Sequence, residues 1–301
     1  MLNLHRLMVL HQFALRGSIS TTAEALGYSP SAVSQQLSAL ERQTGVALLE
    51  RTARSATLTD AGHLLARRAA DLMAATEAAE AELHESAGTI SGSVTISVIP
   101  TVVPYIAAEL ARLAAATPRL ELVLRQAESS DALRLLERSD VDVAVVDVWP
   151  PRRTITSPRM RSTPLVRDRL VVAMPPGHAL ASSTSAIGLK ELAPHLASDT
   201  WLCAPHGHPS RAGTDAMLRR HDLEPGTRWE FEGLSTIAGL VAQGTGIAVL
   251  PRLALSGLGG IHTRELRPAA HRSIVAVTRT SARKRPAVAA TLATLREAFV
   301  P

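Results

Sequence analysis

The sequence predicts an α/β protein whose N-terminal part is rich in helix. Within 20–43, two short amphipathic segments are separated by a turn of a few residues. A helical pattern without Gly or Pro then follows Gly62 and continues to Ala87. From residue 94 onward, strand patterns alternate with helical patterns, which is typical of an α/β domain with a largely parallel sheet.

The first short helix of the pair is expected to begin at Ser20, which is a good N-cap. Thr21 and Glu24 have the spacing of a capping box and offer an alternative start. The helix should end at Gly27, because helices commonly end in a left-handed glycine. An earlier helix should pack beneath the pair through the apolar residues Leu4, Leu7, Met8 and Leu15.

The second short helix has two coinciding start signals, since Ser29 is a good N-cap and Pro30 fits the first helical position. Its expected core side holds Val33, Leu37 and Leu40. Its opposite side is uncharged and holds Ser31, Ser34, Gln35 and Ser38. Short hydroxyls and a glutamine suit a surface pressed against base edges and phosphates. An ordinary solvated helix face is the alternative.

Beyond Gly45, the segment LLERTARSATLT has apolar ends and a polar middle, which predicts a two-stranded wing. Its tip would carry Arg51, Thr52, Arg54 and Ser55. In a winged helix-turn-helix such residues neutralise phosphates or enter the minor groove. A solvated hairpin without a partner is the alternative.

From Phe13 to Gly62 the chain resembles the LysR-type transcriptional regulators. The matching positions are Phe13, Gly17, Ser18, Ala23, Leu26, 29–34, Leu40, Glu41, Gly45, Leu48, Arg51, Leu58, Thr59, Ala61 and Gly62. The family commonly has Gln at Pro30, so base readout is expected to depend on Ser31, Ser34 and Gln35. It also commonly has Phe at Leu49, which alters core packing. The implied DNA-contacting set is Ser20, Thr21, Thr22, Pro30, Ser31, Ala32, Ser34, Gln35, Ser38, Arg51, Thr52, Arg54 and Ser55.

The helical pattern from Thr59 to Ala87 predicts a linker helix of roughly 40 Å. A coiled-coil-like stripe of mostly small or apolar residues follows Leu65, Leu72, Thr76, Ala79 and Leu83. We expect this helix to pair with its twin, which gives a homodimer, two-fold symmetry and a palindromic-like DNA site. Packing on its own chain is the alternative, and pairing of dimers into a homotetramer is left open.

A short hinge over 89–92 should lead into the larger part of the chain. Expected strands are 94–99, 120–124, 141–148, 169–174, 200–203, 228–231, 246–251 and 273–277; expected helices are 103–116, 130–138, 189–193, 209–221, 234–243 and 286–299. A Pro- and Arg-rich passage over 149–164 interrupts the pattern. The series is too long for one compact sheet and predicts two α/β subdomains facing each other.

The LysR resemblance implies a periplasmic-binding-protein-like fold for this part. The expected boundaries are 1–58 for the DNA-binding domain, 59–88 for the linker helix and 89–301 for the effector-binding domain. Lobe I would hold about 92–163 and 267–301, and lobe II about 164–266. By the family's pattern, a small effector would contact Pro100, Thr101, Val102, Ser129, Ser130, Pro205, His206, Gly207, Leu234 and Gly246. Hydroxyls and free N–H groups at helix starts favour a polar or anionic ligand, although each could be a plain helix cap.

The net charge and composition are compatible with DNA binding but do not by themselves indicate it. The net charge is +5 and the pI near 10.2, and residues 1–68 carry seven arginines against four acids. The N-terminus has no secretory pattern, and no apolar run reaches the ~18 residues of a membrane span. Cys203 is the single cysteine, which excludes an internal disulfide and fits a reducing cytoplasm.

Enzyme motifs are weak, and we expect no metal, no cofactor and no catalytic role. Cys203, His206 and His208 lie close in sequence, but no second pair completes a metal site. The sequence after Gly246 does not continue a dinucleotide fingerprint. Asp140, Asp142 and Asp147 alternate with valines as strand-edge residues would. The rival class is a solute-binding protein or an enzyme on the same two-lobed fold, and neither accounts for the N-terminal part.

Overall fold

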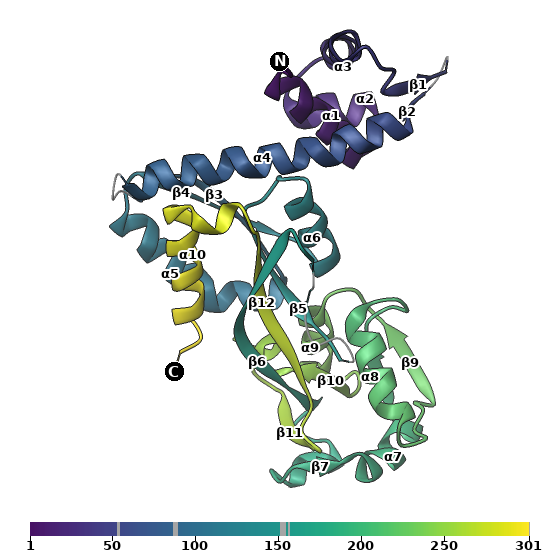
Figure 1. Ribbon diagram of the computed structural model, residues 1–301. Coiled ribbons are helices and arrows are strands. Elements are labelled where there is room, and N and C mark those ends of the chain that lie inside the picture. The colour runs from purple at the N-terminus through teal and green to yellow at the C-terminus, as the bar shows by residue number, and fades with distance from the viewer. Residues whose placement is uncertain (53–54, 87–89, 151–154, 156, 301) are drawn as a thin grey trace. The chain divides into compact units, whose positions relative to one another are not determined.

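The computed structural model describes residues 1–52, 55–86, 90–150, 155 and 157–300 (Figure 1). The chain forms two compact units. Unit 1 comprises Met1–Thr89 with Thr280–Pro286, and unit 2 comprises Ile90–Arg279 with Ala287–Pro301. Among the described residues, no helix combines the length and apolar character needed to cross a membrane.

Unit 1 is a three-helix bundle with a two-stranded wing and a long helix. Its elements are α1 Leu4–Arg16, α2 Ile19–Leu26, α3 Pro30–Thr44, β1 Leu49–Arg51, β2 Ala56–Leu58, α4 Asp60–Ser86 and η4 Ala282–Lys284. The predicted start of α2 was wrong. The helix begins at Ile19, because Ser18 is the N-cap and accepts from the Thr21 N–H at 3.1 Å. The predictions for Gly27 and Ser29 are confirmed, since Gly27 is left-handed and Ser29 caps α3.

The core of unit 1 forms where α1, α2 and α3 meet the wing and the start of α4. Its buried side chains include Leu10, Phe13, Leu37 and Leu40. Gly62 lets α4 approach the wing, because a Cβ there would lie 2.1 Å from the Leu48 carbonyl oxygen.

The first part of α4 packs in the core of unit 1, and η4 also contacts this helix. Ala66 and Ala69 are buried in the core, whereas Leu72 and Leu83 are 46% and 71% exposed. The predicted long helix is therefore confirmed, and it leaves part of its apolar stripe uncovered. The last residue of the predicted helix, Ala87, and the first residue of the predicted hinge, Thr89, lie outside the described residues, and β3 begins at the last hinge residue, Gly92.

Unit 2 contains a mixed sheet with helices on both faces. Its first part holds β3 Gly92–Val98, η1 Pro100–Val102, α5 Val103–Ala116, β4 Leu120–Gln126, α6 Ser129–Glu137, β5 Val143–Val148 and β6 Met160–Met174. Next come η2 Ala179–Ser182, β7 Ile187–Gly188, α7 Leu189–Ser198, β8 Thr200–Cys203, α8 Pro209–Arg219, β9 Thr227–Glu230 and α9 Leu234–Ala242. The last elements are β10 Ala248–Pro251, η3 Arg252–Leu255, β11 His262–Arg267, β12 His271–Arg279 and α10 Pro286–Glu297.

The strand order is β4-β3-β5-β12-β6-β11-β7, with β10 also paired to β6, and β8-β9 form a separate parallel pair. The strands β3, β4 and β5 run parallel, whereas β12 is antiparallel to β5 and β6. In lobe I, α5 and α10 cover one face and α6 covers the other (Figure 1). In lobe II, α7 and α8 pack in one core cluster and α9 in another. The unit is thus two-lobed, as predicted.

The strand β6 is longer than predicted and connects the two lobes. Residues 160–169, apart from Leu165, pair with β12, and the last five residues pair with β10 and β11. The predicted interruption over 149–164 was therefore wrong from Met160 onward, because Pro164 lies beside a register shift in the β12–β6 pair that leaves Leu165 of β6 unpaired. The strand β11 was missed, since its polar sequence HTRELR gives no apolar alternation.

Candidate DNA-binding surface and effector site

The outer side of α3 is the surface that the sequence predicted. Val33, Leu37 and Leu40 are buried in the core. On the opposite side, Ser31 and Gln35 are exposed. Ser34 and Ser38 are half-buried, and the reason lies in the wing.

Arg51, on the first wing strand, reaches across to α3. Its Nη1 donates to Ser34 Oγ at 3.1 Å and its Nη2 to Ser38 Oγ at 3.0 Å. The Glu41 carboxylate lies 3.5 Å from the same guanidinium. Because all these groups are partly exposed, the ion pair contributes little to stability. Its consequence is geometric, since it makes the wing and α3 one continuous polar surface.

Glu41 also positions the start of the wing. Its Oε1 accepts from the backbone N–H groups of Leu48 and Leu49, each at 3.0 Å. One carboxylate therefore holds the wing strand through two backbone bonds and the wing arginine through its other oxygen. At the far end of the wing, the Thr52 and Ser55 hydroxyls lie 2.8 Å apart. Arg54 lies outside the described residues.

The predicted contacts at the start of α2 divide into exposed and buried positions. Ser20 is exposed, and Thr21 is exposed with its hydroxyl 2.7 Å from Ser18 Oγ. The prediction for the Thr22 side chain was wrong, because it is fully buried and donates to the Ser18 carbonyl at 2.6 Å. At the start of α3, Pro30 is exposed and Ala32 is half-buried.

In unit 2, two predicted effector residues converge on a buried arginine that the sequence did not single out. Arg272, on β12, is 1% exposed. Its Nη2 donates to Thr101 Oγ1 at 2.7 Å, its Nη1 to Asp147 Oδ2 at 2.9 Å and its Nε to Asp168 Oδ2 at 2.9 Å. The guanidinium also lies 5.6 Å from the centre of the Trp149 ring. We call Arg272, Asp147, Asp168, Thr101 and Trp149 the arginine network.

Ser129 joins the arginine network through Asp147. The Ser129 hydroxyl donates to Asp147 Oδ1 at 2.5 Å and accepts from the Asp147 N–H at 3.0 Å. The Trp149 indole N–H donates to Asp147 Oδ2 at 2.6 Å. On the lobe II side, Asp168 Oδ1 accepts from the Leu253 N–H at 3.1 Å. The network therefore links η1 and α6 of lobe I to η3 of lobe II.

The other predicted effector positions have varied surroundings. The Val102 side chain is fully buried in the lobe I core, and its predicted contact with a ligand stays a prediction. Pro100 begins η1, and Ser130 is exposed on α6. Gly246 packs against β8, because a Cβ there would lie 2.2 Å from the Thr200 carbonyl oxygen.

The loop 205–207 and Leu234 lie in lobe II. His206 and Gly207 are exposed, and Gly207 has a positive φ of 90°. Leu234 lines a very small cavity of about 10 Å³ beside Arg211 and Cys203. No residue of the arginine network lines this small cavity.

Cys203 and its neighbours are held by contacts within lobe II. Burial raises the pKa of the Cys203 thiol despite the adjacent Arg211, whose Nη1 lies 3.0 Å from Sγ. Arg211 also donates to Asp215 at 2.7 Å and to Glu230 at 2.9 Å. His208 is the N-cap of α8, since its Nδ1 accepts from the Ser210 N–H at 3.2 Å.

A histidine cluster in lobe II was not predicted. Asp199 Oδ2 lies 2.9 Å from His178 Nε2 and 3.2 Å from His195 Nδ1. Burial raises the pKa of Asp199, but hydrogen bonds and charge from both imidazoles hold it below its usual value. His178 Nδ1 also accepts from the Leu180 N–H at 3.1 Å, so the cluster ties η2 to α7. Only the sequence spacing of His195 and Asp199, one helical turn apart, could have indicated it.

A winged helix-turn-helix joined to a two-lobed α/β domain defines a DNA-binding, ligand-responsive regulator. Comparison with family models specifies the class further. The model for "Bacterial regulatory helix-turn-helix protein, lysR family" matches residues 4–63, and the model for "LysR substrate binding domain" matches residues 87–300. The chain belongs to the LysR family of transcriptional regulators.

Individual relatives share most of the chain. A "Probable hydrogen peroxide-inducible genes activator" from Streptomyces viridosporus is 31% identical over 92% of this chain and 88% of its own. The "DNA-binding transcriptional dual regulator OxyR" of Escherichia coli is 26% identical over 84% of this chain and 80% of its own. Both are named as regulators of transcription.

Solved structures share the fold. A full-length OxyR variant from Pseudomonas aeruginosa matches with a TM-score of 0.72 and 22% identity over 98% of each chain. A hydrogen peroxide-bound mutant of OxyR from Corynebacterium glutamicum matches with a TM-score of 0.59 and 26% identity, over 99% of this chain and 92% of that one.

Proposed function

We propose that this LysR-type regulator binds DNA through α3 and the wing, and that its sequence preference depends on Gln35 and Ser31. The observation that carries this proposal is the joining of Arg51 to Ser34 and Ser38, which gives one polar surface from two elements. A glutamine side chain reads adenine edges in the major groove, and arginine neutralises phosphates. Ser20, Thr21, Pro30, Ser38, Thr52, Arg54 and Ser55 would contact the backbone around this centre, and Ala32 would lie at its edge.

We propose that the protein is a homodimer paired along α4. Leu72 and Leu83 are exposed on this helix, and the LysR family is one in which oligomers are usual. Pairing would cover both leucines and place two copies of α3 in a two-fold arrangement. Assembly of dimers into a tetramer would use surfaces other than this stripe. A regulator of chromosomal genes acts in the cytoplasm, and we propose that location.

We further propose that a small polar or anionic effector binds at the arginine network. Thr101 and Ser129 are the predicted positions that meet there, and Arg272 supplies the positive charge. An anion that competes with Asp147 or Asp168 for the guanidinium would change how lobe I is tied to lobe II. This is a two-state mechanism, in which the effector favours the lobe arrangement that it binds more tightly.

The effector is proposed not to act through a disulfide within the chain. Several relatives are named for induction by hydrogen peroxide, but this chain has a single cysteine. Two thiols are required for such a bond. Cys203→Ser should therefore keep effector-dependent regulation. No enzymatic activity is proposed, because Asp147 and Asp168 are engaged by Arg272 and not free for acid-base chemistry.

A DNA-binding titration tests the proposal. Fluorescence anisotropy would be measured with a labelled duplex from upstream of the protein's own gene and with a scrambled duplex, each over a salt series. Gln35→Ala should reduce the preference for the specific duplex by about tenfold, because a bidentate base contact is worth about 1–3 kcal/mol. Arg51→Met should weaken both duplexes and lower the salt slope. Equal binding of both duplexes by the wild type would overturn sequence-specific recognition.

A matched control is Arg112→Met. Arg112 lies on α5 and pairs with Glu109 on the same helix, so it belongs to no proposed DNA contact. Its substitution removes the same charge from the chain as Arg51→Met. A loss of affinity equal to that of Arg51→Met would show that only net charge matters and that the wing has no specific role.

A further inference from the structure

A cavity in the described part of unit 2 lies away from the predicted effector residues. It has a volume of about 720 Å³, which is within the usual range for small-molecule sites. Strands β5, β6 and β12 form one wall, α8 forms another, and the 268–270 loop closes a side. None of the ten predicted effector positions lines it.

On β5 and β12 the cavity and the arginine network occupy opposite faces, whereas β6 lines the cavity with Arg167 and with Leu170, two residues from Asp168. Arg272 is directly opposite Asp168 in the β12–β6 pair, and Ser273 is directly opposite Arg167. Ser273 is also opposite Val148 of β5. Because successive strand residues point to opposite faces, the row of Val148, Ser273 and Arg167 faces away from the network. All three residues of that row line the cavity.

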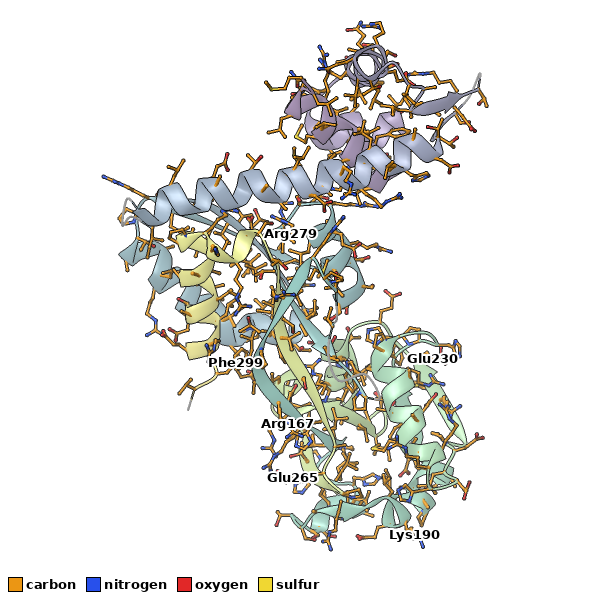
Figure 2. The ribbon with its side chains drawn as sticks, in the orientation of Figure 1. Arg167, Lys190, Glu230, Glu265, Arg279 and Phe299 are labelled. Atoms are coloured by element: carbon orange, nitrogen blue, oxygen red, sulfur yellow. The ribbon has the colours of Figure 1, made fainter. Side chains whose placement is uncertain are left out.

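The cavity is cationic and has no acidic lining residue. Arg167, Arg220, His221 and His271 contribute nitrogen donors, and no Asp or Glu is among the lining residues. Figure 2 marks Arg167 on the strands that cross between the lobes. Among the described residues, neither Arg167 nor Arg220 has a carboxylate within ion-pair distance. By contrast, the neighbouring Arg169 and Arg219 pair with Glu265 at 2.7 Å and Asp215 at 3.9 Å.

The rest of the lining is apolar. It comprises Val148, Pro150, Leu170, Leu189, Gly213, Ala216, Met217, Pro268, Ala269 and Ala270. A ligand there would bury a hydrophobic body against these side chains and place a negative group near the two arginines. Apolar walls with a few convergent polar groups are the usual composition of a small-molecule site.

We propose that this cavity is a second ligand site, distinct from the arginine network, and that it binds an organic anion with an apolar body, such as an aromatic carboxylate. The carboxylate would accept charge-assisted hydrogen bonds from Arg167 and Arg220. The aromatic body would pack on Ala216, Met217 and Ala269. An inorganic anion lacks the apolar body and would bind weakly.

A ligand in this cavity is connected to the arginine network through Trp149. Gly213 lines the cavity, and a Cβ added at Gly213 would lie 3.2 Å from the Trp149 ring. The same ring lies 5.6 Å from the Arg272 guanidinium and donates to Asp147 at 2.6 Å. Displacement of α8 by a ligand would therefore move the indole that supports the network.

The test uses the full-length protein with anilinonaphthalene sulfonate as a fluorescent probe, and naphthoate or naphthalenemethanol as competitors. Naphthoate should displace the probe with a Kd about tenfold lower than that of the neutral alcohol, because two charge-assisted hydrogen bonds favour the anion. Naphthoate should also raise the melting temperature, since it binds the folded state. Equal displacement by both competitors would overturn the proposal.

Variants locate the probe. Arg220→Gln and Arg167→Gln should each weaken naphthoate by about five- to tenfold. The control Arg219→Gln, one residue away on the end of α8 and outside the lining, should not change its Kd. Ala216→Phe should fill the cavity and abolish saturable binding, and Ala269→Phe does the same from the opposite wall if α8 does not tolerate the larger side chain.

Two further outcomes would also overturn the proposal. Retained binding in both cavity-filling variants, with unchanged circular dichroism, would mean that the probe binds elsewhere. Weakening by Ser129→Ala together with no effect of Arg220→Gln would place the probe at the arginine network. That second result would support the proposed effector site while refuting the cavity, so the two proposals fail independently.

Discussion

Replacing Arg272 with Met should destabilise unit 2 more than Arg112→Met, Arg167→Gln or Arg220→Gln. The guanidinium is almost completely buried and donates to two carboxylates and one hydroxyl. Methionine matches much of the side-chain volume but removes the charge. Asp147 and Asp168 would then lose their common cation, and Asp168 is itself only 3% exposed.

The expected loss in unfolding free energy is about 3 kcal/mol. Breaking a buried ion pair by removing one partner costs about 3–5 kcal/mol. The lower end applies here because Asp147 keeps the Ser129 and Trp149 donors and Asp168 keeps the Leu253 N–H. A loss of this size should lower the melting temperature by about 6–12 °C.

Tryptophan fluorescence during urea unfolding measures this loss selectively, because Trp149, Trp201 and Trp229 all belong to unit 2. The control is Arg125→Met, an exposed residue of β4, which should change the free energy by less than about 0.5 kcal/mol. Adding Asp168→Leu to Arg272→Met should recover part of the loss, because it removes an unpaired buried charge. A loss below about 1 kcal/mol for Arg272→Met would refute the network as the tie between the lobes.

Three further predictions concern other parts of the molecule. Burial and then the charges of Arg167 and Arg169 lower the pKa of His271 below 6.5, so the unfolded chain binds the proton more tightly than the folded chain. The free energy of unfolding should therefore fall as the pH drops through 6.5. His271→Asn should show a smaller fall in the urea midpoint between about pH 7.5 and 5.5 than the wild type does. Gly246→Ala should cost about 2 kcal/mol or more by thermal melting because its Cβ would overlap the Thr200 carbonyl, and a cost near zero would contradict that contact. Leu83→Glu should shift the protein from dimer to monomer in light scattering, and an unchanged mass would refute pairing along α4.

Local signals explain why much of unit 1 could be predicted from sequence. The Ser29 cap, the Pro30 start and the left-handed Gly27 depend on a few adjacent residues, and the structure confirms each. The start of α2 was placed too late because Ser18, Ser20 and Thr21 are all acceptable caps. Only the hydrogen bond from the Thr21 N–H to Ser18 distinguishes them.

The arginine network could not be predicted because its contacts are distant in sequence. Arg272 bonds residues that are 104, 125 and 171 positions away. Its sequence surroundings, an arginine at the start of an apolar strand, resemble an exposed strand end. The family pattern indicated Thr101 and Ser129. Their partners, Arg272 and Asp147, are brought to them only by the pairing of distant strands.

The missed strand β11 has a similar cause. Its inward residues are Arg264 and Leu266, and the burial of Arg264 depends on a bond from its Nε to the Ser185 carbonyl at 2.8 Å. A buried arginine breaks the apolar alternation by which strands are found. The cavity behind the arginine network likewise requires the register of β5, β6 and β12, which no local pattern supplies.

The most direct measurement of the central proposal is a hydroxyl-radical footprint of the region upstream of the protein's gene. A dimer that presents two copies of α3 should protect two half-sites separated by about one helical turn of DNA or a multiple of it. Gln35→Ala should erase the protection at both half-sites while leaving weak, uniform coverage. A single protected patch, or a pattern unchanged by Gln35→Ala, would contradict recognition by a paired α3.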